Sequence, residues 1–142
     1  MAMTIRNAVP EDELSIVVLW RSCDLVASYN DPGADFRFAM QGSSSAVLVA
    51  EDDEVGVTGS VMVGHDGHRG WLYYLATAPD ARGQGVGRAM VEAGERWLSA
   101  RAVRKVQLMV RRTNKGVVSF YKHLGYEDTP RVIMAKWLAE PE

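Results

Sequence analysis

The sequence has few of the features that mark secreted or membrane-spanning proteins. Cys23 is the only cysteine, which excludes an internal disulfide. No apolar run approaches the ~20 residues that a membrane-spanning helix needs, and residues 1–7 lack the basic start and apolar stretch of a secretory signal. We therefore expect a protein of the reducing cytoplasm with no membrane partner.

Basic residues are scarce in the first 60 positions, where 3 of them stand against 10 acidic ones. Between residues 82 and 122 the balance reverses, with 10 basic residues against 2 acidic ones. The net charge of −2 conceals this segregation. Two interpretations of this segregation stay open. The charges are solvated surface charge, or the C-terminal half binds a polyanion and the N-terminal half binds a cation.

The chain of 142 residues is close to the commonest size of one domain, so we expect a single domain over 1–142. Apolar runs that suit strands alternate with longer segments of helical spacing, which favours a layered α/β or α+β fold. The expected strands are 3–8, 46–50, 55–63, 71–78, 106–110 and 132–137, and the expected helices are 10–25, 35–41, 85–97 and 115–124.

The most informative segment is the glycine-containing loop 82–88, Arg-Gly-Gln-Gly-Val-Gly-Arg, which lies between a predicted strand and a predicted amphipathic helix. Glycines let a ligand approach the backbone, and the free N–H groups of a helix's first turn favour an anion such as a diphosphate. Lys-Ser or Lys-Thr does not follow the last glycine, and the spacing is not that of the dinucleotide fingerprint, so both of those nucleotide loops are excluded. A tight turn with no ligand remains the alternative.

Two motifs about 30 residues apart give this loop a family context. Arg82-x-x-Gly85-x-Gly87, after Leu75-Ala76-Thr77 and Pro79, resembles the coenzyme A pyrophosphate motif of the GCN5-related N-acetyltransferase (GNAT) family. The second signature of that family resembles Asn114-x-x-Val117-x-x-x-Tyr121-x-x-x-Gly125-Tyr126, with Val117 where alanine is usual. The resemblance covers nearly the whole chain and implies a mixed, mostly antiparallel sheet of six to seven strands flanked by about four helices.

A narrower resemblance is to the bacterial YpeA-type subgroup, which is close to the ribosomal-protein alanine acetyltransferases. It rests on Leu19-Trp20-x-x-Cys23-Asp24-Leu25, on Asn30-Asp31-Pro32, and on the segment 66–70 before Tyr73.

The resemblance implies an acetyl-CoA-dependent N-acetyltransferase in which a primary amine attacks the thioester directly in a ternary complex. Acetyl-CoA would be the cosubstrate, and no metal is expected. The acceptor would be a small molecule or a protein amino group, and a homodimer is a habit of the family. Two alternatives remain. The first is a non-catalytic acyl-CoA-binding module on the same fold. The second is a nucleic-acid-binding protein that uses the basic residues, although the sequence contains no recognised nucleic-acid-binding motif.

The resemblance also assigns site residues. Tyr121 would be the general acid that protonates the departing CoA thiolate. The backbone of residues 75–77 would bind the pantetheine arm, with a local β-bulge that aims one N–H at the acetyl oxygen. The N–H groups of residues 83–88 would hold the pyrophosphate. The full set expected at the cosubstrate is Leu75, Ala76, Thr77, Arg82, Gly83, Gln84, Gly85, Val86, Gly87, Arg88 and Asn114.

The base and the acceptor pocket are less clearly marked. Many relatives carry a carboxylate on the fourth strand, where this chain has residues 71–74, Trp-Leu-Tyr-Tyr; a water relay with Glu51, Asp66 or His68 is the expectation that remains. An apolar wall with several acids suits a cationic amine. The residues expected there are Trp20, Asp24, Tyr29, Asn30, Asp31, Asp35 and Tyr73. The alternative is that Trp20 packs in the core while Asp24 and Asp31 cap turns.

Overall fold

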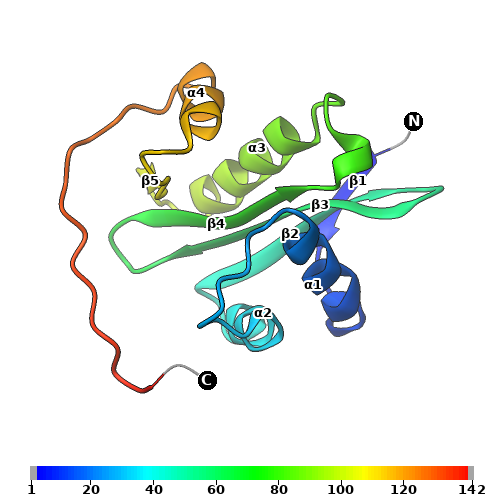
Figure 1. Ribbon diagram of the computed structural model, residues 1–142, viewed down its shortest axis with the longest axis horizontal. Coiled ribbons are helices and arrows are strands. Elements are labelled where there is room, and N and C mark those ends of the chain that lie inside the picture. Colours follow the sequence, from blue (N-terminus) through cyan, green and yellow to red (C-terminus); the bar gives the residue numbers. More distant parts are fainter. Residues whose placement is uncertain (1–2, 141–142) are drawn as a thin grey trace. The chain divides into compact units, whose positions relative to one another are not determined.

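The computed structural model describes residues 3–140, which form two compact units that meet in the sequence at Leu108 and Met109 (Figure 1). The first unit contains a sheet and three helices, and the second contains one helix followed by extended chain. A single domain over 1–142 stays a prediction.

The first unit is built on one five-stranded sheet. Its strands are β1 (Met3–Asn7), β2 (Ser45–Asp52), β3 (Gly56–His65), β4 (Gly70–Thr77) and β5 (Val106–Gln107). They lie in the order β1-β2-β3-β4-β5; the first four are antiparallel, and β5 runs parallel to β4. The mixed, mostly antiparallel sheet is confirmed, with five strands in the described part of the chain rather than six to seven.

Helices cover both faces of this sheet. On one face lie α1 (Glu13–Ser22), which follows the short 3₁₀ turn Pro10–Asp12, and α2 (Pro32–Met40). On the other face lies α3 (Val86–Ser99), entered through a second 3₁₀ turn, Pro79–Ala81 (Figure 1).

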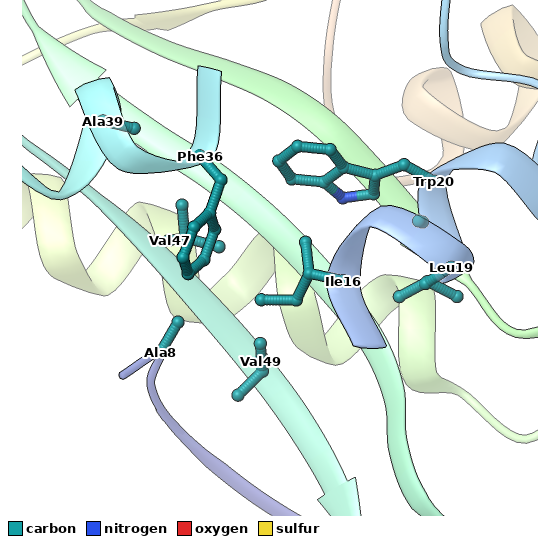
Figure 2. Close-up of a cluster of buried hydrophobic side chains, with 9 residues drawn as sticks. Ala8, Ile16, Leu19, Trp20, Phe36, Ala39, Val47 and Val49 are labelled. Atoms are coloured by element: carbon teal, nitrogen blue, oxygen red, sulfur yellow. The ribbon is translucent and has the colours of Figure 1, made fainter. Parts of the chain in front are cut away.

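The core under α1 and α2 is formed by buried apolar side chains. Figure 2 shows Ile16 and Trp20 of α1 and Phe36 of α2 against Val47 and Val49 of β2, with all five side chains almost completely buried. Because strand side chains alternate between faces, Val47 and Val49 point to the same side of the sheet. This core fixes where the loop between α1 and α2 can lie, and that loop borders the cavity described below.

The second unit contains α4 (Lys115–His123), whose C-terminus explains the spacing of the second motif. Gly125 has a φ of 94°, the N–H of Tyr126 donates to the carbonyl oxygen of Tyr121 at 3.1 Å, and the N–H of Gly125 donates to that of Lys122 at 3.1 Å. This is a Schellman cap, in which the residue after the left-handed glycine packs on the last turn of the helix. The rings of Tyr121 and Tyr126 meet edge to face at 5.5 Å.

Four predicted elements differ from the structure by three residues or more. The first helix ends at Ser22 instead of residue 25 because Asp24 adopts a φ of 58°. The second helix begins at Pro32 instead of residue 35, since the Asp31 side chain caps it through the N–H of Ala34 at 3.1 Å.

The other two errors concern strands. Only Val106 and Gln107 of 106–110 pair with β4, and residues 132–137 form no strand in the described structure. An alternating apolar pattern predicts a strand only where another strand offers its hydrogen bonds, and Val132 and Met134 stay 87% and 89% exposed.

Candidate active site

The loop after β4 presents the N-terminus of α3 to solvent. Gly83 and Gly85 have φ values of 80° and 81°, and Gly85 is the N-cap of this 14-residue helix. No side chain caps the helix, and its first turn holds no acidic residue. Residues 82–85 are exposed, and a Cβ atom built on either glycine would meet nothing within 4 Å. The first-turn N–H groups and the positive end of the helix dipole therefore make an open anion site.

Two arginines border this anion site. Arg82 is exposed at the start of the loop. Arg88 lies in the first turn of α3, and its Nε is 3.7 Å from the Glu92 carboxylate, with the arginine side chain 67% exposed. An exposed pair at this distance is weak, so Arg88 can exchange its carboxylate partner for a phosphate at little cost.

Strand β4 is kinked close to the loop. Ser60 pairs with Ala76 and Met62 pairs with Tyr73, so Val61 alone stands opposite Tyr74 and Leu75. Tyr74 has a φ of 50°, a left-handed conformation that costs a residue other than glycine ~1–2 kcal/mol. Because of this β-bulge, Tyr73 and Tyr74 both lie on the face covered by α1 and α2, although they are neighbours in sequence.

Buried hydrogen bonds hold the kink. The indole N–H of Trp20 donates to Ser60 Oγ at 2.8 Å, and the Ser60 hydroxyl donates to the carbonyl oxygen of Tyr74 at 3.2 Å. The Trp20 ring stacks on the Tyr74 ring at 3.9 Å, and the Tyr74 hydroxyl donates to Asp35 Oδ2 at 2.7 Å. Burial, and then the Asp35 carboxylate, raise the pKa of Tyr74 well above its ordinary value. Elements α1, α2 and β3 thus fix one strained residue of β4.

Strand β4 pairs with β5 at Gly70 and Trp71. The part of β4 that carries Leu75, Ala76 and Thr77 lies outside this ladder. The Thr77 carbonyl oxygen accepts a bond from Cys23 Sγ at 3.2 Å. These are the residues expected to hold the pantetheine arm.

A cavity of about 980 Å³ lies on the α1/α2 face, beside the first half of β4. Among the residues predicted for the acceptor, it is lined by Asn30, Asp35 and Tyr73. Burial, and then the charge of Asp66, raise the pKa of Tyr73.

The remaining predicted acceptor residues lie elsewhere. Trp20 is 0% exposed and belongs to the core, and Asp31 caps α2. For these two residues the alternative, a core tryptophan and a capping aspartate, is confirmed. Asp24 is exposed at the end of α1, and Tyr29, 49% exposed, is not among the residues that line the cavity.

The three candidate bases are separated as well. Asp66 lines the cavity, and its Oδ1 accepts the N–H groups of His68 and Arg69, which hold its pKa below the ordinary value. Glu51 is paired with Arg6 at 3.2 Å. His68 is exposed in the turn. Of the three, only Asp66 is placed to meet an acceptor.

In the second unit, Asn114 is the N-cap of α4 and is exposed. Tyr121 is buried, its ring contacts that of Phe120 at 5.1 Å, and burial raises the pKa of its hydroxyl to about 12. Tyr121 therefore stays protonated at neutral pH.

Sequence reasoning missed Ser60 and Tyr74, which hold the kink. Nothing in the sequence marks Ser60. The β-bulge itself is the one that the family resemblance implies, and the pair Tyr73-Tyr74, which interrupts the alternation of a half-buried strand, indicates its position.

An exposed glycine loop before an uncapped helix, a kinked strand and a ligand-sized cavity together suit a protein that brings an anionic compound to a second substrate. Residues 14–126 match the family model described as the Acetyltransferase (GNAT) family. The chain belongs to that family, and it is an acetyl-CoA-dependent N-acetyltransferase.

Its relatives support this assignment. The chain is 39% identical over 138 residues to an acetyltransferase of Pectobacterium atrosepticum, covering 97% of both chains. It is 38% identical over 136 residues to an acetyltransferase of Yersinia pseudotuberculosis, covering 96% of both. These names favour an enzyme over a non-catalytic acyl-CoA module.

Solved structures show the same fold. Aminoglycoside N-acetyltransferase AAC(6')-Iy in complex with CoA superposes with a TM-score of 0.82 at 21% identity, over 97% of this chain and 96% of that one. Glucosamine-6-phosphate N-acetyltransferase of Arabidopsis thaliana gives 0.75 at 19% identity, over 98% and 100%.

Two further properties concern the described residues alone. None of their helices is both long and apolar enough to cross a membrane. Their histidine, cysteine, aspartate and glutamate side chains form no group of three or more that could hold a metal ion.

Proposed function

We propose that this enzyme holds acetyl-CoA by its diphosphate at the N-terminus of α3, and that a primary amine in the cavity beside β4 attacks the thioester directly. The observation that carries the proposal is the uncapped, acid-free first turn of α3 behind two left-handed glycines. The exposed backbone of this turn fits two linked phosphates, and the kink in β4 lies between this loop and the cavity along the strand.

In the proposed reaction, the lone pair of the amine nitrogen forms the new C–N bond, and the electrons of the C–S bond leave with sulfur. Tyr121 gives its proton to that sulfur, and the proton lost by the amine returns to Tyr121 through water. An N–H at the β4 kink, that of Leu75, donates to the acetyl oxygen as negative charge develops there.

The raised pKa of Tyr121 decides what kind of acid it is. At about 12 it lies ~3.5 units above that of an ordinary thiol, so full transfer to a solvated thiolate would be uphill. Burial disfavours a thiolate as well and raises the pKa of the thiol. We therefore propose that Tyr121 protonates the sulfur only while both groups are shielded from water.

The need for a base depends on the acceptor. An α-amino group with a pKa near 8 is uncharged about one time in ten at pH 7, whereas a lysine-like amine with a pKa near 10.4 is uncharged in about 1 of 2,500 molecules. Asp35 and Asp66 are the lining carboxylates, and either can accept the amine proton through a bridging water.

Amine-dependent release of the CoA thiol tests this proposal. We expect sequential kinetics, in which lines at different amine concentrations intersect, and thiol release that requires the amine. Parallel lines, or an acetylated enzyme isolated before amine is added, would contradict direct attack.

The kink can be tested through Ser60. Changing Ser60→Ala leaves the buried indole N–H of Trp20 without its acceptor, which should cost ~1–3 kcal/mol of unfolding free energy. It also frees the Tyr74 carbonyl, so we expect kcat to fall about tenfold with little change in the KM for acetyl-CoA.

The matched control is Thr58→Ala, which removes another buried hydroxyl of β3, one that bonds to Ala50 of β2 at 3.5 Å. It should lower stability and leave kcat nearly unchanged. Equal kcat losses in the two variants would show that the kink has no part in turnover.

Three finer assignments stay predictions: the YpeA-type subgroup, the homodimer and the cytoplasmic setting. The free Cys23 thiol supports the last of these. The proposed acceptor is either a small molecule or a protein amino group.

A further inference from the structure

The cavity beside β4 has carboxylates at two places and no lysine or arginine among the residues that line it. Asp35 comes from α2, and Asp66 comes from the turn between β3 and β4. Its one basic lining residue is His65, whose Nδ1 accepts the N–H of Gly67 at 3.2 Å. The charge of the lining favours a cationic occupant.

The two carboxylates are tied to different positions of the same strand. The Tyr74 hydroxyl donates to Asp35 Oδ2 at 2.7 Å, and the Trp71 indole N–H donates to Asp66 Oδ2 at 3.3 Å. An extended strand rises ~3.3 Å per residue, so Trp71 and Tyr74 are at most ~10 Å apart along β4. The cavity therefore has one carboxylate bonded to the side chain at each of two β4 positions that are three residues apart.

Aromatic and apolar side chains also line this cavity. The rings of Trp71 and Tyr73 are stacked with centroids 6.3 Å apart and an interplanar angle of 20°. Tyr73 is 43% exposed, and Phe38 of α2 and Met62 of β3 line the same cavity. Aromatic faces attract ammonium groups, and the apolar surface between them suits methylene carbons.

We infer that the acceptor is a dication, a primary amine that carries a second ammonium group at the other end of an apolar chain. The reacting nitrogen lies at the Asp35 end, next to the kink of β4. The second ammonium lies at the Asp66 end, against the Trp71 and Tyr73 rings. This inference rests on the proposed function, because it takes the kink as the place where the acetyl group is received.

The test compares diaminopentane with hexylamine, which has a methyl group in place of the second ammonium. Binding to the CoA-saturated enzyme is measured by calorimetry, and kcat/KM is measured with acetyl-CoA. We expect diaminopentane to be favoured about fivefold or more at low salt, with the advantage shrinking as salt is added. Equal values, or a preference for hexylamine, would overturn the inference.

The variant Asp66→Asn removes the charge and keeps an oxygen for the N–H groups of His68 and Arg69. We expect it to reduce the affinity for diaminopentane to that for hexylamine. The matched control is Asp53→Asn, which removes an exposed carboxylate from the turn at the opposite end of β3. A diamine advantage that survives in Asp66→Asn, or one that both variants lower equally, would contradict the assignment of Asp66.

Failure of this inference and failure of the proposed function give different results. Equal acetylation of both amines contradicts the inference and leaves the acetyl-transfer proposal intact. Preferential binding of diaminopentane without any acetyl transfer supports the dication site and contradicts the proposed reaction.

Discussion

Changing Tyr121→Phe is expected to lower kcat about 100-fold or more while the KM for acetyl-CoA changes by less than about threefold. The variant keeps the ring that packs against Phe120 and Tyr126 and removes only the hydroxyl proton. A general acid acts on the leaving group, so its loss affects turnover more than binding. Initial rates over a range of acetyl-CoA concentrations separate the two parameters.

The matched control is Tyr126→Phe, which removes a phenol hydroxyl from the ring that touches Tyr121. It should keep most of the wild-type kcat. A Tyr121→Phe enzyme that turns over at the wild-type rate would remove this residue from the mechanism.

The pH profile provides an independent check of the same role. The protonated phenol is the active form, and its pKa is raised to about 12. Activity should therefore rise with pH as the amine loses its proton, and it should show no decline due to Tyr121 until the pH approaches 12. A decline in kcat near pH 9 or 10 in the wild type, absent from Tyr121→Phe, would contradict the raised pKa.

The second large effect is expected at the loop. Gly85 has a φ of 81°, a conformation in which a β-branched residue is a genuine outlier. Changing Gly85→Val should cost ~2 kcal/mol to hold the loop in its binding shape, which corresponds to about a 30-fold weaker affinity for acetyl-CoA. Calorimetric titration with acetyl-CoA measures that loss.

Gly56→Val is the control, because Gly56, the first residue of β3, has a φ of 87° and equally open surroundings. Both variants should lose unfolding free energy, and only Gly85→Val should lose affinity for acetyl-CoA. Comparable affinities in the two variants would mean that the loop does not bind this compound.

The sequence predicted the parts of the site that depend on local backbone chemistry. The loop could be predicted because glycines followed by an amphipathic helix determine the local backbone. The spacing from Tyr121 to Tyr126 follows from a helix cap that needs a left-handed glycine. Such features involve residues close in sequence, which a motif can record.

The cavity, and the residues that hold the kink, could not be predicted in this way. Ser60 holds the kink because the indole of Trp20, 40 residues earlier in the sequence, donates to its hydroxyl. Asp35 holds Tyr74 because α2 brings its carboxylate to the Tyr74 hydroxyl. Trp20 illustrates the same limit: an aromatic residue near acidic ones suggests a binding wall, whereas packing buries it beneath the strand that borders the cavity. Contacts of this kind arise from tertiary structure and leave no fixed spacing in the sequence.

The most direct test of the account follows the backbone amide signals of residues 83–88 by NMR while CoA is added, with pantetheine as the control ligand without the diphosphate. If the first turn of α3 holds the diphosphate, CoA should shift the amide signals of Gly85 to Arg88, and pantetheine should leave them unchanged. Saturating CoA that leaves these amides unchanged in the folded protein would contradict the claim that the first turn of α3 holds the diphosphate.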